Sequence, residues 1–165
     1  MAYITLSKNN FFHNLDIIAN KCKGKDKIAL VLKDNAYGHG LLEIASMAKE
    51  YGITKAVVKD TDEAKKILDY FDYILVLADF PQSEDEKIAY TINTLDAISK
   101  FPRGTKVALK IDTGMHRNGI RISEIKQAKE AIKKQGLILE SVFTHHRNAD
   151  ALTSEFFGKT SNLKL

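Results

Sequence analysis

One lysine stands at the end of an apolar run that is typical of a buried β-strand. Residues 28–32 read Ile-Ala-Leu-Val-Leu, and Lys33 follows them, ahead of Asp-Asn-Ala-Tyr-Gly-His-Gly. Parallel strands are covered on both faces, so we expect solvent to be excluded around Lys33. Burial without a partner favours the neutral amine, which is a nucleophile toward aldehydes and can form a Schiff base. Position alone nevertheless favours a simpler alternative, in which the lysine has cleared the sheet and reaches water.

An arginine and a pair of histidines are the other candidates for chemistry. Arg117 lies at a glycine-rich bend just after the strand pattern of residues 106–112. A guanidinium binds a carboxylate in a fork, so this arginine fits an anion site, although an ordinary surface loop would also explain it. His145 and His146 are neighbours on a predicted strand and would point to opposite faces. Because no cysteine or carboxylate supplies a spaced third ligand, we predict no metal site.

The elements that must position these residues alternate between short β-branched runs and helical patterns. After a strand-like piece at residues 2–6, strands are predicted near residues 27–33, 55–58, 73–78, 89–93, 106–112 and 137–145. Helices are predicted at residues 7–21, 40–51, 60–68, 94–100 and 123–135. This alternation predicts βα units around a parallel sheet, which a doubly wound fold and a barrel explain equally well. Gly38 and Gly40 lack the third glycine of a dinucleotide-binding fingerprint.

The composition excludes several classes of protein. The 165 residues are 44% hydrophobic and 28% charged, as in soluble globular domains, and no apolar run approaches the roughly 20 residues of a membrane span. The first residues show no signal-peptide pattern, and the single cysteine, Cys22, fits a reducing cytoplasm. The net charge of +4 is concentrated after residue 100. The lysines there recur on one helix face without interleaved aromatic residues, so we expect no nucleic-acid partner.

Three separated stretches resemble the alanine racemase family in the expected order. VLKDNAYGHG, at residues 31–40, resembles the segment around the family's pyridoxal-phosphate lysine. KIDTGMHRNGI, at residues 110–120, resembles KVDTGMGRLGF, and VFTHHRNAD, at residues 142–150, resembles FTHFATAD. DTDEAKKI also follows KAVV in the same register, so the resemblance runs from residue 1 to about 157. The chain departs from the family pattern at Asp34, His116, Asn118, His146, Arg147 and Asn148.

The resemblance implies roles for five residues. Lys33 would carry pyridoxal 5'-phosphate as a Schiff base, and Tyr37 would meet the phosphate of that cofactor. Arg117 would hydrogen-bond the phenolic oxygen of the cofactor and lie close to the substrate carboxylate. Lys110 matches a lysine that is often carbamylated and orients the arginine. His145 matches a histidine packed near the cofactor ring.

The same resemblance implies a fold and an activity. The fold would be α/β, of the (β/α)8 TIM-barrel type, and incomplete, with about six of eight βα units present. Residues 1–165 would be the N-terminal part of the cofactor-binding barrel, without the remaining strands and the C-terminal β domain. The complete protein would be a cytoplasmic bacterial isomerase, a homodimer that interconverts L- and D-alanine and supplies D-alanine for peptidoglycan.

By this resemblance the chain alone is expected to be inactive. Lys33 would serve the D-alanine face, whereas a tyrosine from the C-terminal domain of the partner subunit would serve the L-alanine face. Two alternatives stay open. One is a pyridoxal-phosphate carrier protein with the same barrel, although its lysine motif lacks Asn-Ala-Tyr-Gly-His-Gly. The other is a truncated polypeptide without catalytic activity.

Overall fold

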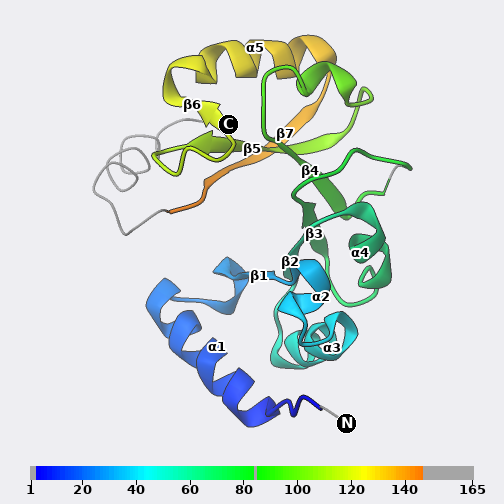
Figure 1. The fold of residues 1–165 in the computed structure, drawn as a ribbon, viewed down its shortest axis with the longest axis vertical. Helices are drawn as coiled ribbons and strands as arrows, with labels where there is room; N and C mark the ends of the chain where they lie inside the picture. Colours follow the sequence, from blue (N-terminus) through cyan, green and yellow to red (C-terminus); the bar gives the residue numbers. More distant parts are fainter. Residues whose placement is uncertain (1–2, 84, 147–165) are drawn as a thin grey trace. The chain divides into compact units, whose positions relative to one another are not determined.

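The computed structural model of this chain describes residues 3–83 and 85–146 (Figure 1). Its elements fall into two compact units, Met1–Asp79 and Phe80–Leu165. Each unit is built on parallel strands with helices between them, as the sequence predicts. Within the described ranges, no helix combines the length and the apolar character needed to span a bilayer.

In its described residues the first unit contains three strands, four helices and one 3-10 turn. They are α1 (Lys8–Cys22), the 3-10 turn η1 (Lys25–Lys27), β1 (Ala29–Val31), α2 (Lys33–Tyr37), α3 (Leu41–Tyr51), β2 (Lys55–Val58), α4 (Thr61–Lys66) and β3 (Tyr73–Val76). β1 pairs with β2 and β2 pairs with β3, in both cases parallel, with Val31 opposite Val57 and Val58 opposite Val76. The carboxyl ends of these strands therefore meet at one edge.

Local sequence signals set the limits of these helices. α1 begins after Ser7, whose hydroxyl accepts a hydrogen bond from the Asn10 N–H at 3.3 Å. α4 begins after Asp60, whose carboxylate accepts one from the Glu63 N–H at 2.9 Å. α3 ends at Gly52, which takes the left-handed conformation that favours glycine. Small and branched apolar side chains fill the core beneath these helices, among them Ala45, Ala48, Ala56, Val58, Ala64, Ile67 and Ile74.

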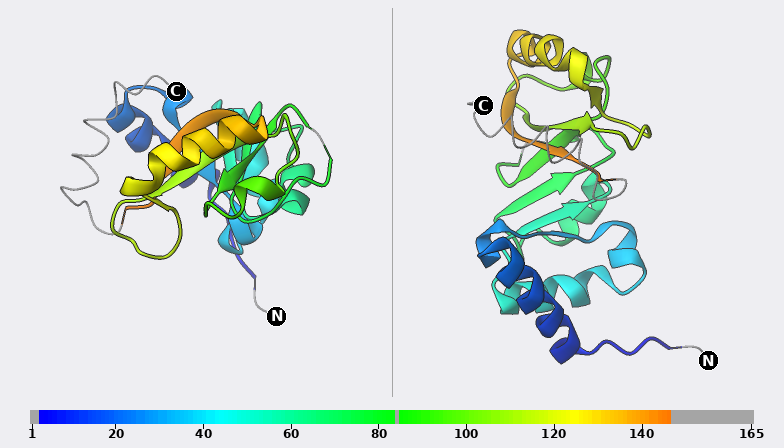
Figure 2. Two further views of the ribbon diagram at one scale, coloured as in Figure 1. Left: turned by 90° about the horizontal axis from the view of Figure 1, so that it is seen from above. Right: turned by 90° about the vertical axis from the view of Figure 1, so that its left-hand side faces the viewer.

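The second unit is centred on one long strand. Its elements are β4 (Ile88–Ile92), η2 (Ile98–Lys100), β5 (Lys106–Asp112), β6 (Ile120–Arg121), η3 (Ile122–Glu124), α5 (Ile125–Gln135) and β7 (Ile138–Thr144). β5 lies parallel to β4, β6 and β7, and its residues 107–111 are all buried. α5 contacts η2, β6 and β7, and it runs along one side of these strands (Figure 2).

Two predicted elements differ from the structure. Residues 3–6 belong to no strand, and Tyr3 is 88% exposed, so the strand predicted at residues 2–6 is not formed where the chain is described. The helix predicted at residues 94–100 is reduced to turns and the short η2. Phe101 is extended, with φ −81° and ψ 133°, because the proline that follows it disfavours the helical conformation.

The expectation that the strand before Lys33 is covered on both faces is also wrong. Its side chains alternate, with Ile28 and Leu32 buried and Ala29 and Val31 exposed. Val31 is 40% exposed. β1 therefore buries only one face in this chain, and Lys33 follows it as the first residue of α2.

Candidate functional site

Lys33 and Tyr37 lie together at the carboxyl end of β1. Lys33 is the first residue of α2, and its side chain is half-buried. Its Nζ lies 5.8 Å from the centroid of the Tyr37 ring, within the range of a cation–π contact. The Tyr37 side chain is exposed at 58%. The structure thus brings an amine and a phenol to one accessible place.

The backbone between these two residues forms a turn of left-handed helix. Asp34, Asn35, Ala36 and Tyr37 have φ angles of 54°, 56°, 51° and 55°. For L-residues the left-handed conformation costs about 1–2 kcal/mol per residue, so four in succession are kept only where the surroundings over-determine them. We call Asp34–Tyr37 the left-handed turn.

Hydrogen bonds inside and after the left-handed turn fix its two ends. The Ala36 N–H donates to the Leu32 carbonyl at 2.8 Å, and the Gly40 N–H donates to the Asn35 carbonyl at 3.1 Å. The Asn35 side chain accepts from the Leu41 N–H at 2.8 Å and so satisfies the first turn of α3. The left-handed turn is therefore tied to the strand before it and to the helix after it.

Glu63 is a residue of this site that the sequence reasoning missed. It lies in the first turn of α4, yet one oxygen of its carboxylate accepts a hydrogen bond from the Asn35 N–H. The other oxygen accepts from the Lys59 N–H just after β2. The sequence offered one indication of Glu63, the position of DTDEAKKI after KAVV in the same register as the family. That register does not predict the two hydrogen bonds of its carboxylate.

In the second unit, Lys110 and Arg117 frame the loop that follows β5. Lys110 lies on β5, is 8% exposed and donates a hydrogen bond from Nζ to Asn118 Oδ1. Arg117 is exposed in the loop, and in the described part of the chain its guanidinium makes no hydrogen bond or ion pair. Asn118, one of the departures from the family pattern, thus contacts the Lys110 amine.

The end of β7 adjoins the same loop. Thr144 lies 2.8 Å from Thr113, measured between the two hydroxyl oxygens, and its hydroxyl donates to the Ile111 carbonyl at 2.7 Å. His145 follows Thr144 directly and is exposed. Because β5 and β7 are parallel, Lys110, Arg117 and His145 lie near the carboxyl ends of the strands, where α/β folds carry their ligands.

The five predicted residues therefore form two groups, Lys33 with Tyr37 in the first unit and Lys110, Arg117 and His145 in the second. Each group lies at the carboxyl ends of the parallel strands of its own unit. The chemistry available is that of an amine, a phenol, an arginine and an imidazole. Within residues 3–83 and 85–146, no group of three His, Cys, Asp or Glu side chains is arranged to hold a metal ion.

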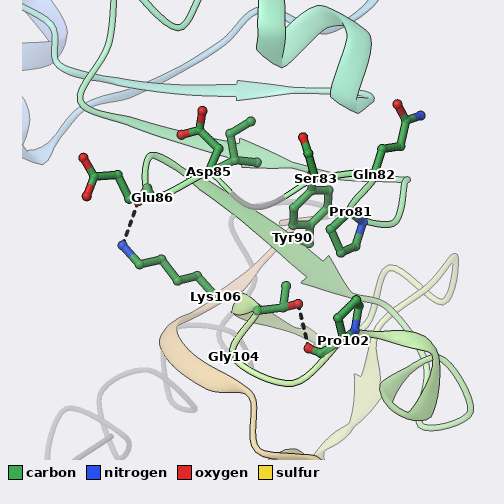
Figure 3. Close-up of a pocket in the computed structure, with 11 residues that line it drawn as sticks. Pro81, Gln82, Ser83, Asp85, Glu86, Tyr90, Pro102, Gly104 and Lys106 are labelled. Carbon is green, nitrogen blue, oxygen red and sulfur yellow. Dashed lines mark hydrogen bonds between the residues drawn. The ribbon is translucent and has the colours of Figure 1, made fainter.

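A cavity of about 390 Å³ lies elsewhere in the second unit. It opens beside the start of β4 and the start of β5, and its lining includes Pro81, Tyr90 and Lys106 (Figure 3). The Lys106 ammonium donates to the Glu86 carbonyl at 2.7 Å across this region. The cavity contains none of the five predicted residues, because it lies at the amino ends of the strands.

Comparisons with known proteins agree on one family. Residues 6–162 match the family model described as alanine racemase, N-terminal domain. An alanine racemase of Nitratiruptor sp. is 52% identical over 157 residues, which are 95% of this chain and 47% of the relative. An alanine racemase of Campylobacter curvus is 43% identical over 165 residues, which are 99% of this chain and 49% of the relative.

Solved structures resemble the chain over a similar extent. A histidine racemase from Leuconostoc mesenteroides has a TM-score of 0.78 at 27% identity, covering 96% of this chain and 48% of that one. An alanine racemase from Bacillus anthracis with bound L-Ala-P has a TM-score of 0.72 at 28% identity, covering 94% and 44%. The chain spans about half the length of the curated relatives it matches.

Proposed function

This chain belongs to the alanine racemase family through its N-terminal domain, and on that premise we propose that it forms the first part of a pyridoxal 5'-phosphate-dependent alanine racemase. The fold is accordingly α/β, of the (β/α)8 barrel type and incomplete. The observation that carries the proposal is the half-buried Lys33 at the carboxyl end of β1, with Tyr37 beside it. A barrel that binds the cofactor without catalysis is the weaker alternative, because the relatives are named as racemases.

The residues present fit the cofactor by their chemistry. The Lys33 amine can bond an aldehyde, and the exposed Tyr37 hydroxyl can donate to a phosphate. When bound, pyridoxal phosphate withdraws electrons from the α-carbon of an amino acid and makes its proton easier to remove. Lys33 Nζ would hold the cofactor and then move that proton on the D-alanine face.

The second group would orient the reacting partners. Arg117 presents a guanidinium fork that suits the substrate carboxylate and the phenolic oxygen of the cofactor. Lys110 is buried on β5 and bonded to Asn118, the neighbour of Arg117; it would support the arginine in the carbamylated form that the resemblance implies. His145 would lie beside the cofactor ring.

The rest of the racemase would come from outside these residues. We propose that residues 1–165 are the N-terminal part of the cofactor-binding barrel, and that further strands, a C-terminal β domain and a second subunit complete the site. The complete protein would be a homodimer in the bacterial cytoplasm and would supply D-alanine for peptidoglycan. The share of the relatives that this chain covers supports the first of these statements.

Reductive trapping tests the proposed role of Lys33. The chain is incubated with millimolar pyridoxal phosphate, reduced with borohydride and mapped by peptide mass spectrometry. We expect label on Lys33 ahead of every other lysine, and loss of that label in Lys33→Arg. Label on other lysines with Lys33 unmodified would end the proposal. Pyridoxal without phosphate is the control, and a smaller preference for Lys33 with this compound would support the role of Tyr37.

A further inference from the structure

We propose that Glu63 is a positioning residue, which holds the left-handed turn and thereby presents the Lys33 amine. Its carboxylate joins two backbone amides that are distant in the sequence. Oε1 accepts from the Asn35 N–H at 2.8 Å, and Oε2 accepts from the Lys59 N–H at 2.9 Å. We call this pair of hydrogen bonds the Glu63 clamp. The inference rests on the proposed function, in which Lys33 carries the cofactor.

The Glu63 clamp begins where the pairing of β1 with β2 ends. The last backbone bond between these segments runs from the Leu32 N–H to the Val57 carbonyl at 2.7 Å. Beyond it the two chains diverge, one into the left-handed turn and the other toward α4. The amides at the start of a helical turn have no partner within that turn. A carboxylate with two acceptor oxygens supplies a partner to an amide on each side of the divergence.

Other hydrogen bonds fix the backbone of Glu63. Its own N–H donates to the Asp60 carboxylate at 2.9 Å, which fixes its place in the first turn of α4. The start of α4 is anchored further, because the Thr61 N–H and hydroxyl both donate to Asp79 Oδ2, at 3.1 and 2.6 Å. The carboxylate of Glu63 therefore reaches the left-handed turn from a fixed backbone.

The other link across this gap is weaker. Lys59 Nζ lies 3.5 Å from Asp34 Oδ1, and both side chains are more than half exposed, at 54% and 53%. Exposed ion pairs contribute little because water screens them and both side chains lose freedom. The two hydrogen bonds of the clamp also lie at the surface, but they are shorter, at 2.8 and 2.9 Å, and each is donated by a backbone amide, one of them that of Asn35, two residues from Lys33. The clamp thus acts directly on the backbone after Lys33, in addition to the hydrogen bonds within the left-handed turn, whereas the ion pair joins two exposed side chains.

The chemistry of the clamp defines the test variant. Glu63→Gln keeps the length and shape of the side chain but offers one acceptor oxygen and an NH2 group, so one of the two amides loses its partner. Asp62→Asn is the matched control. It makes the same change of charge at the preceding, exposed position of α4.

The experiment compares trapping at Lys33 in the intact chain and its variants. Each protein is treated with pyridoxal phosphate and borohydride, and the labelling rate of Lys33 is divided by that of the exposed Lys126 on α5. We expect Glu63→Gln to lower this ratio about tenfold, since a small displacement of a reacting group costs much of its rate. Asp62→Asn should leave the ratio unchanged. Thermal unfolding is recorded for each protein, because a purely structural role would change the melting temperature without this selective loss.

Amide hydrogen exchange separates the failure of the clamp from the failure of the proposed function. If wild-type Lys33 shows no preferential labelling, the cofactor role fails. Amide hydrogen exchange is then the test of whether Glu63 holds the left-handed turn. Faster exchange over residues 33–41 in Glu63→Gln, but not in Asp62→Asn, supports it. Equal exchange, or an unchanged labelling ratio in a folded Glu63→Gln protein, overturns it. Should Glu63→Gln not fold, Glu63→Asp keeps the charge but shortens the reach, and wild-type labelling in that variant would overturn the proposal.

Discussion

At the scale of single residues, Asp112 organises the loop that carries Arg117. Its Oδ1 accepts from the N–H groups of His116 and Gly114, both at 3.0 Å, and its Oδ2 lies 3.1 Å from His116 Nδ1. The bond from the His116 N–H, together with that from Gly114, holds the pKa of Asp112 below its usual value. This carboxylate therefore stabilises the fold above the unfolded pKa of about 3.9, and its contribution is lost as the pH falls through the folded pKa.

Replacing this carboxylate tests that contribution. Asp112→Asn should lower the free energy of unfolding at neutral pH by about 1–2 kcal/mol, because a neutral amide replaces the charged acceptor of these bonds. It should also flatten the fall in stability as the pH drops below about 4, toward the folded pKa. Urea unfolding across this range measures both effects, with Asp62→Asn as the control. An acid dependence identical to that of the wild type would contradict the assignment.

At the scale of elements, the link from β5 to β6 requires a glycine. Gly119 has a φ of 123°, and a Cβ there would lie 2.8 Å from the Asp112 backbone nitrogen. Gly104 precedes β5 in the same unit with a φ of 86°, but a Cβ there would meet nothing within 4 Å. We expect Gly119→Ala to lower the free energy of unfolding by about 2–4 kcal/mol, through strain and a backbone clash. Gly104→Ala, which adds strain alone, should cost about 1 kcal/mol. If urea unfolding shows equal losses of unfolding free energy for the two variants, the predicted clash at Gly119 is wrong.

The sequence predicts most elements of this fold because their signals are local. Alternating apolar runs predict the strands that begin at Lys55, Tyr73 and Lys106, and Ser7 and Asp60 predict two helix starts. Non-local contacts decide the rest. β6 is two residues long and too short to show a period.

Some features of the candidate site follow from the local sequence, and others depend on contacts with residues distant in the sequence. The motif around Lys33 predicts the lysine and the tyrosine, which the structure places together. No local pattern predicts four successive positive φ angles in Asp34–Tyr37, since only asparagine and aspartate among these residues tolerate the conformation well. The Glu63 clamp adds a contact to this segment from a residue 28 positions away in the sequence.

At the scale of the whole molecule, the 165-residue polypeptide should not racemise alanine by itself. It spans about half the length of its relatives, and the proposed second acid/base group lies outside it. A positioned acid or base typically gives 10²–10⁴-fold in rate, so the loss of one removes most of the turnover. D-amino-acid detection with added pyridoxal phosphate measures this, with a full-length racemase as the positive control. Turnover on the order of 10 per second would show that no acid/base group from outside these residues is needed.

The left-handed turn also has a consequence for the order of folding. Ala36 and Tyr37 disfavour the left-handed conformation that they adopt, and the partner of the Asn35 N–H is Glu63, which lies 28 positions later in the chain. We therefore expect this segment to stay outside the folding nucleus and to close after β1, β2 and the start of α4 have come together. Substitutions in Asp34–Tyr37 should therefore speed unfolding while leaving the rate of folding almost unchanged. The segment that carries the proposed chemistry would be the last to form and the first to open.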